Sequence, residues 1–380
     1  MPILPLLLLA LSPIQIDGSF EDWTASENSF EDSGYFYKRI KLPRTACLQK
    51  LSNEKMVTIG PYEILLSPKD SGQGVSCSIG GKKISPYAVG LVFAPTTASR
   101  EFEIRVNKPE TKQPRCSFAL ENTGTFRVVS WNVQLGNLLD NTQCSTRILK
   151  ALKPDVLLLQ ELDSNDTPES VGRFLQDTFG NTWHVLMSEP TGTKRHHALR
   201  SAIASTFPLE EIEMKKKGTL KAVRANADIN GTKVQFISLH LRCCGGPTGE
   251  QEEQRQREAK IIRRAAKSPT SRASIIGGDW NLVGTMKPLK LVTANDFTIV
   301  HAAQPDGALF ATWSNTNSPF TPGRLDWIVF NGKKLQTSNS FVLDSSDFDA
   351  ETLEKYGLLR NDTANLSDHL PLVADFLITK

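Results

Sequence analysis

Several features that define other protein classes are absent from this chain of 380 residues. Its six cysteines include no Cys-x-x-Cys spacing, which argues against a structural zinc site. It has no glycine-rich nucleotide loop, internal repeat or low-complexity tract, which argues against nucleotide-binding and repeat architectures. The apolar run at residues 1–13 is too short for a membrane span and contains prolines.

Composition and length predict a folded chain of two domains. Hydrophobic residues make up 39% and charged residues 22%, the balance of a soluble globular protein. The length exceeds that of one ordinary domain. The formal net charge of +3 is a mild lean toward anionic substrates and is no proof of nucleic-acid binding.

Residues 1–13 predict a signal peptide, because an apolar core of suitable length precedes polar sequence. We therefore expect a secreted or periplasmic protein. A buried N-terminal strand is the alternative, since no lysine or arginine precedes the core and Pro13 disfavours cleavage. Four separated cysteines could form disulfides after export: Cys47, Cys77, Cys116 and Cys144. Cys243 and Cys244 are adjacent and cannot easily pair with each other.

Residues 14–118 predict a smaller all-β domain of the sandwich type. Short strand-like runs alternate there with clusters of Gly, Pro, Ser and Asn. The stretch IQIDGSFEDW, which starts at Ile14, resembles the entry strand of DOMON-like and carbohydrate-binding-like sandwiches. That resemblance implies a carbohydrate or cell-surface contact, and a domain that binds nothing is the alternative. Residues 119–124 are the predicted linker.

Residues 125–380 alternate between strand-like and helix-like segments. Helices are predicted around CSTRILKAL, VGRFLQDTFG and EEQRQREAKIIRRAA. The mixed charges of the third predict a solvated helix. Together the pattern predicts an α/β sandwich, in which two sheets pack face to face and helices cover the outside.

Polar side chains end six of the hydrophobic strand-like segments in this second domain. In chain order these are Asn132, Glu161, His240, Asp279 with Asn281, Asp326, and Asp368 with His369. Gly277 and Gly278 precede Asp279 and predict a tight turn. Asp279 and Asn281 are separated by one residue, so in an extended strand their side chains lie on the same side.

This ordered set is similar to the endonuclease/exonuclease/phosphatase superfamily, which has the fold of pancreatic-type deoxyribonucleases. The resemblance covers about residues 125–380 and implies a metal-dependent hydrolase of phosphate esters. Phosphodiester hydrolysis needs an activated water, a cation on the phosphoryl oxygens and a stabilised leaving group. Magnesium or manganese suits this task, since hard cations prefer oxygen ligands.

The resemblance also implies a role for each residue. Asn132 and Glu161 are the first metal ligands, with Asp368 as a third. One of Asp279 and Asn281 holds the attacking water while the other binds the phosphate.

His369 is the base or the stabiliser of phosphate charge, Asp326 orients it, and His240 supplies a second imidazole. Taken singly, the asparagines could be turn residues, Asp326 part of an ion pair, and the histidines structural. The ordered set favours the active site.

The predicted function is a phosphodiesterase or endonuclease, with nucleic acid among the candidate substrates and a monomer as the expected form. A phosphatase or sphingomyelinase-like phosphoesterase of the same fold is the alternative. A non-catalytic carbohydrate- or surface-binding protein is the alternative from another class. Trp313 and Asn317 are predicted to border the cleft, where Trp313 either stacks on a base or sugar or simply packs its loop.

Overall fold

A computed structural model describes residues 14–24, 27–66, 74–109, 115–193, 196–214, 220–267, 273–294 and 296–379. The signal peptide predicted at residues 1–13 lies outside these ranges. None of the helices within them is both long and apolar enough to cross a membrane.

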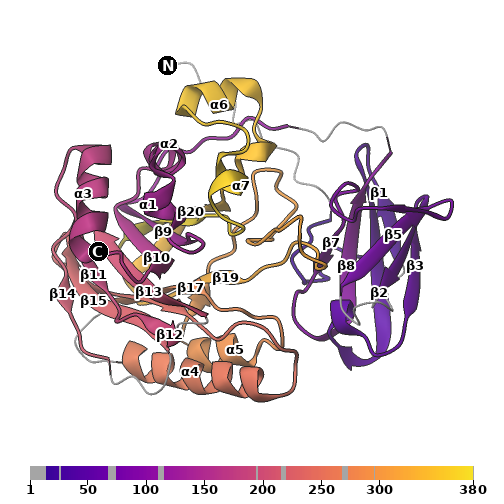
Figure 1. Cartoon of the computed structure of the whole chain (residues 1–380), viewed down its shortest axis with the longest axis horizontal. Helices are drawn as coiled ribbons and strands as arrows, with labels where there is room; N and C mark the ends of the chain where they lie inside the picture. The colour runs from indigo at the N-terminus through magenta and orange to yellow at the C-terminus, as the bar shows by residue number, and fades with distance from the viewer. Residues whose placement is uncertain are drawn as a thin grey trace.

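The N-terminal part of the chain folds into two antiparallel sheets, as predicted for a smaller all-β domain (Figure 1). One sheet has the order β1-β2-β8-β7 and the other the order β3-β4-β5-β6. The strands are β1 (Ser29–Glu31), β2 (Tyr35–Ala46), β3 (Lys55–Ile59), β4 (Tyr62–Leu66), β5 (Val75–Ile79), β6 (Lys82–Ile84), β7 (Val92–Ala94) and β8 (Ser99–Asn107), with the 3-10 helix η1 (Leu48–Lys50) after β2. Buried side chains from both sheets, such as Ile64 and Phe102, share one core.

Residues 14–18, predicted as an entry strand of this domain, belong to neither of its sheets. Ile16 instead forms an isolated bridge with Leu309, and its N–H donates to the Ala308 carbonyl over 2.8 Å. Ile14 and Ile16 pack in a small apolar cluster with Trp23. The entry-strand prediction was therefore wrong: the side chains of Ile14 and Ile16 pack on β2 and β7, but the backbone of Ile16 pairs with Leu309 of the second domain and with no strand of the β domain.

The second domain has four layers, in which helices cover the outer faces of two packed sheets (Figure 1). The first sheet has the order β11-β13-β10-β9-β21-β20, with β12 beside β13. Its strands are β9 (Phe126–Asn132), β10 (Val156–Asp163), β11 (His184–Met187), β12 (Thr191–Thr193), β13 (His196–Ser205), β20 (Leu335–Val342) and β21 (Leu372–Ile378). The second sheet has the order β14-β15-β16-β17-β19-β18. Its strands are β14 (Glu210–Glu211), β15 (Lys221–Ile229), β16 (Thr232–His240), β17 (Ala273–Asp279), β18 (Thr298–Ile299) and β19 (Asp326–Asn331). The predicted α/β sandwich is confirmed.

The helices bury their apolar sides against the sheets. On the first sheet lie α1 (Asn137–Asp140), α2 (Thr142–Leu152), α3 (Pro168–Phe179), α6 (Ala350–Tyr356) and α7 (Asp362–Leu366), with the 3-10 helix η2 (Ser345–Asp347) before α6. On the second sheet lie α4 (Glu250–Ala266) and α5 (Lys287–Thr293). Local sequence explains the ends of α3, where Thr167 and Ser170 form a capping box and Gly180 ends the helix at a φ of 77°.

Helix α4 is less solvated than its charges suggested. Arg255 is fully buried and donates to Glu252 Oε2 from Nε and Nη2, over 3.0 and 2.8 Å. Its Nη1 donates to the carbonyls of Arg242 and Cys244. The predicted solvated face is present, with the exposed pair of Glu253 and Arg257, but on the other face one buried cation ties the helix to the loop that follows β16.

Gly277 and Gly278 lie within β17 and form no turn, contrary to the sequence prediction. A Cβ atom at Gly277 would approach Leu158 Cδ1, on the facing sheet, to 2.7 Å. A Cβ atom at Gly278 would lie 1.9 Å from the Leu239 carbonyl oxygen, at a φ of 151°. Gly277 thus allows the two sheets to pack closely behind Asp279, whereas Gly278 allows a close approach to the backbone of β16 in its own sheet.

All six cysteines are free thiols in the structure. The disulfides expected among Cys47, Cys77, Cys116 and Cys144 are therefore not formed. The adjacent Cys243 and Cys244 form no disulfide with each other, as expected, and the Cys244 thiol donates a hydrogen bond to Cys243 Sγ over 2.7 Å.

A buried ion pair links β9 to β21 and generates a stability prediction. Arg127 donates to both carboxylate oxygens of Asp375, over 2.6 and 2.8 Å, and its Nη1 donates to the carbonyls of Leu120 and Leu152. Asp375→Asn should lower the free energy of unfolding by about 3–5 kcal/mol, because it leaves a buried guanidinium without its counter-charge. Denaturant titration measures the loss. Glu210→Gln, which breaks an exposed pair with Lys233, is the control and should leave the midpoint almost unchanged. Equal midpoints for both variants would contradict the prediction.

Candidate active site

Strand register brings the predicted residues to one edge of the two sheets. In the first sheet β9 and β10 are parallel, and Asn132 lies opposite Gln160, next to Glu161. In the second sheet β16 and β17 are parallel, with His240 opposite Asp279, and the antiparallel β19 places Asp326 opposite Asp279 on its other side. The carboxyl ends of parallel strands share an edge, so residues distant in sequence become neighbours.

Asn132 links the two sheets at this edge. Its Nδ2 donates to Glu161 Oε1 over 3.0 Å and to Asp279 Oδ2 over 3.2 Å. Asn281 donates twice to Asp279, from its backbone N–H to Oδ1 and from Nδ2 to Oδ2, each over 2.9 Å. Its Nδ2 also donates to the Leu241 carbonyl. Asn281 therefore orients the Asp279 carboxylate in this structure, and its amide hydrogens are engaged.

Glu161 occupies a strained backbone position. Its φ is 59°, and the pairing register of β10 with β13 shifts between Leu159 and Leu162. A non-glycine residue in this region costs on the order of 1–3 kcal/mol. The bulge re-aims the carboxylate toward Asn132, and the Leu135 N–H donates to its second oxygen over 3.3 Å.

His369 and Asp326 form a buried pair. The ring Nδ1 lies 2.8 Å from Asp326 Oδ2, and Nε2 lies 3.8 Å from Asp279 Oδ2. Burial by itself would lower the pKa of His369, but the carboxylates of Asp326 and Asp279 outweigh it and raise that pKa to about 10. His369 is therefore a cation at neutral pH, which favours the charge-stabilising role over the role of base.

His240 has the opposite charge state. Its Nε2 lies 3.5 Å from Asp279 Oδ2 and 3.8 Å from Glu161 Oε1. Burial, Lys221 and the charge on His369 hold its pKa well below the usual range, so the ring is neutral and these contacts are not ion pairs. Burial also raises the pKa of Asp279, to about 8, against the opposing effect of His369.

The cluster fits a divalent cation. Glu161, His240 and Asp279 offer ligand atoms that all lie within 4.8 Å of one another, and Asp279, Asp326 and His369 do the same. Two buried atoms of these groups, His240 Nδ1 and Asp326 Oδ1, have no hydrogen-bond partner within the described part of the chain. Converging carboxylate oxygens are ligands that magnesium or manganese prefers. The Asn132 amide oxygen, predicted as a ligand, accepts from the Gln134 N–H over 3.0 Å, while the amide nitrogen faces the carboxylates.

Asp368 lies apart from both clusters. Its Oδ2 accepts from Trp313 Nε1 over 3.1 Å and from Asn315 Nδ2 over 3.3 Å, and its backbone N–H donates to Gln134 Oε1. Its role as a third metal ligand stays a prediction. Asn317 is exposed, and its backbone N–H donates a hydrogen bond to the nearby Asn315 Oδ1.

A model of the endonuclease/exonuclease/phosphatase family matches residues 129–369, which is more than half of the chain. The chain belongs to this family. Members are typically metal-dependent phosphoesterases, and the residues above offer a site for such a metal.

Several solved structures are similar to this chain. One is an endonuclease/exonuclease/phosphatase family protein from Leptotrichia buccalis, 14% identical, with 66% of this chain and 99% of that chain covered and a TM-score of 0.49. A second is an endonuclease/exonuclease/phosphatase from Bacteroides vulgatus, 14% identical, with 67% and 99% covered and a TM-score of 0.46. A third is truncated TDP2 from Caenorhabditis elegans, 20% identical, with 66% and 97% covered and a TM-score of 0.45. Among curated proteins, no match was found.

Several residues that support the site were not predicted from the sequence motifs. Ser367 Oγ donates to the Asn132 carbonyl over 2.7 Å and accepts from the His369 N–H. Thr312 Oγ1 accepts from the Asp326 N–H. Ser367 was detectable, since a serine two residues before a histidine commonly bonds its backbone locally. Thr312 and Asn315 carry no such signal, because their contacts are long-range.

Metal binding can be measured without assuming a reaction. At a Mn²⁺ concentration one hundred times the Kd, wild-type protein should gain about 2.7 kcal/mol in unfolding free energy by linkage. Glu161→Gln keeps the side-chain shape and should lose most of that gain, because it removes a charged ligand. Glu169→Gln, at an exposed carboxylate on α3, should retain the full gain. Equal stabilisation of the wild type and Glu161→Gln would remove Glu161 from the metal site.

Proposed function

We propose that this protein is a divalent-metal-dependent phosphodiesterase that acts as an endonuclease. The observation that carries the proposal is the cluster of Glu161, Asp279 and cationic His369, which the Asn132 side chain and the Asp326 pair hold at one sheet edge. The carboxylates can bind a metal cation and accept a proton from water, and the fixed positive charge beside them can stabilise a phosphate group. This combination suits the attack of water on an anionic ester.

Asn132 and Glu161 would hold Mg²⁺ or Mn²⁺, with Asp368 as the third ligand. When bound, the cation supplies charge neutralisation at the phosphoryl oxygens. The protein side chains would position the phosphoryl oxygens through the cation. The strained backbone of Glu161 serves this purpose, because it directs the carboxylate into the site.

Asp279 is the base in the proposed reaction. A water oxygen forms the new bond to phosphorus, and the water proton passes to the ionised Asp279 carboxylate. Its raised pKa of about 8 makes this carboxylate a stronger base than an ordinary one, and the ionised form gains population as the pH rises through that value. The bond from phosphorus to the leaving oxygen breaks, and that oxygen takes a proton from solvent. Asn281 keeps the carboxylate oriented throughout.

The His369 cation neutralises charge that develops on the phosphoryl group. Asp326 holds Nδ1, which leaves Nε2 directed to the Asp279 side of the site. His240, which is neutral, donates or accepts a hydrogen bond beside Glu161 without adding charge.

The substrate is decided by an assay panel. Activity on DNA or RNA, with and without magnesium, supports the endonuclease proposal. Activity only on sphingomyelin, inositol phosphates or a phosphate monoester identifies the sphingomyelinase-like or phosphatase alternative. Inactivity on all of them, with retained carbohydrate or surface binding, identifies the non-catalytic alternative.

We also propose that the protein is exported to the periplasm or secreted, because residues 1–13 have the apolar core of a signal peptide. The expected form is a monomer. Contact with carbohydrate or a cell surface through the β domain belongs to the same proposal.

Removal of the metal should abolish hydrolysis. Chelation should reduce the rate to background, and Glu161→Ala should lower kcat/KM about a thousandfold, or roughly 4 kcal/mol of transition-state stabilisation. Initial rates at saturating metal measure the effect. Full activity of the variant in chelator would refute the assigned site.

Asp326 and His369 should act as a unit. His369→Ala should lower kcat with little change in KM, because it removes charge stabilisation from the transition state. Adding Asp326→Ala to that variant should cost clearly less than the same change in the wild type. Steady-state kinetics on the four proteins measure the coupling, and strict additivity would show that Asp326 is not the partner of His369 in catalysis.

A further inference from the structure

The N-terminal β domain contacts three loops of the catalytic domain, and each loop adjoins active-site residues. All the family motifs lie after residue 125, and no pattern in the sequence predicts these contacts between the domains. The largest of these loops, residues 313–324, begins beside Asp368 and ends two residues before Asp326.

The 313–324 loop donates three hydrogen bonds to Asp368. Trp313 Nε1 and Asn315 Nδ2 both donate to Asp368 Oδ2, and the Ser314 N–H donates to the Asp368 carbonyl over 2.8 Å. Both side-chain bonds go to one carboxylate oxygen, so among the described residues Oδ1 is left open for another ligand. The direction of Asp368 therefore depends on where this loop lies.

Tyr87, from the β domain, fixes the loop. Its hydroxyl donates to the Phe320 carbonyl over 2.7 Å and accepts from the Asn315 N–H over 3.1 Å. One phenol thus joins two points of the loop, and one of them is the residue that bonds Asp368. Nearby, the Thr321 N–H donates to Gln49 Oε1 over 2.7 Å, which adds a second anchor from the same domain.

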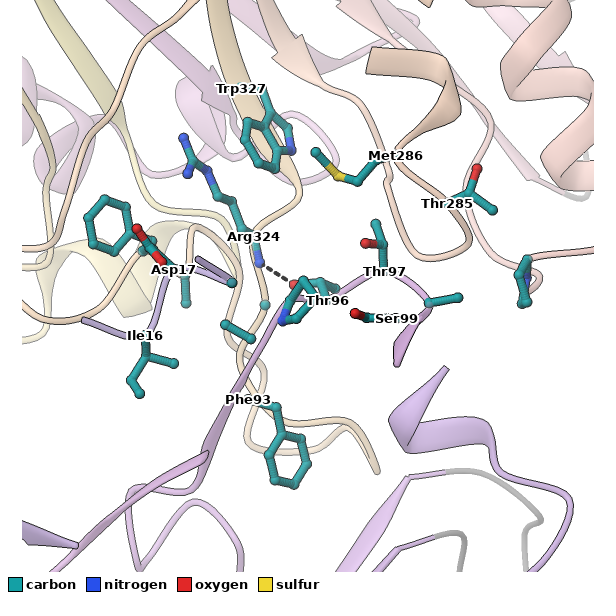
Figure 2. Close-up of a pocket in the computed structure, with 18 of the residues that line it drawn as sticks. Ile16, Asp17, Phe93, Thr96, Thr97, Ser99, Thr285, Met286, Arg324 and Trp327 are labelled. Atoms are coloured by element: carbon teal, nitrogen blue, oxygen red, sulfur yellow. Dashed lines mark hydrogen bonds between the residues drawn. The ribbon is translucent and has the colours of Figure 1, made fainter. Parts of the chain in front are cut away.

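The two other loops are held in the same way. The Ala98 N–H donates to the Gly284 carbonyl over 2.8 Å, close after Asn281, and Lys50 Nζ donates to the Gly245 carbonyl in the loop that follows His240. Figure 2 shows the pocket of about 480 Å³ between the domains, where the Arg324 N–H donates to Thr96 Oγ1 over 2.8 Å. The β domain therefore contacts the loops that adjoin Asp368, Asn281 and His240.

We propose that the β domain is a structural part of the active site and that Tyr87 is a positioning residue for Asp368. The hydroxyl of Tyr87 restrains the 313–324 loop, the loop restrains the Asp368 carboxylate, and the carboxylate completes the metal site. The last step rests on the proposed function, whereas the first two are contacts of the chain itself.

Tyr87→Phe tests this proposal, because it removes only the hydroxyl. Tyr356→Phe is the matched control: the Tyr356 hydroxyl also makes two hydrogen bonds, to the Leu120 N–H and Glu121 Oε2, away from the three loops. Amide hydrogen exchange over residues 313–320 should quicken in Tyr87→Phe and not in Tyr356→Phe. The Kd for Mn²⁺, measured by electron paramagnetic resonance, should rise about two- to tenfold in Tyr87→Phe alone, as expected for the loss of hydrogen bonds of ordinary strength.

A double variant adds a second criterion. Asn315→Ala breaks the same chain of contacts at its next step, so its effect on Mn²⁺ affinity should not add to that of Tyr87→Phe. Equal Mn²⁺ affinity in Tyr87→Phe and Tyr356→Phe, or full additivity with Asn315→Ala, would overturn the inference. If the Tyr87 effects appear while the wild type hydrolyses no phosphodiester, the positioning role stands and the proposed function fails.

Discussion

The structure depends on the convergence of carboxylates at one edge of two packed sheets. Glu161, Asp279 and Asp326 are brought together by strand register, and taking like charges out of water is costly unless they are paired. The protein meets this cost with amide donors from Asn132 and Asn281 and with one buried cation, His369. The arrangement that makes folding costly is also the one that attracts a divalent cation.

The two histidines show how environment divides chemical roles within a few ångströms. His369 lies against the Asp326 carboxylate and is charged, whereas His240 lies near Lys221 and the His369 charge and is neutral. In the proposed reaction the His369 imidazolium stabilises charge, and the neighbouring Asp279 carboxylate accepts the proton. The two tasks are therefore carried by different residues. Two charged histidines at these positions would repel each other and would compete with a metal ion for the same carboxylates.

The contacts between the two domains change how the β domain is understood. A domain connected only by a linker would add binding or solubility, but this one donates and accepts hydrogen bonds at loops beside the site. Its own core is independent of the catalytic core, so the two parts are distinct in packing while they share loops. Variation in such a domain would therefore affect the geometry of catalysis as well as any partner that it binds.

The amino-acid sequence by itself determined the α/β sandwich, the β domain and the residues that meet at the site. Apolar runs specify strands, and short motifs at their ends mark the polar groups, so this information is local. Tertiary structure decided the rest. The bulge at Glu161, the packing role of Gly277 and the burial of Arg255 depend on neighbours far away in sequence. The same holds for the Tyr87 contact, because a hydrogen bond between residues more than two hundred positions apart leaves no pattern in either segment.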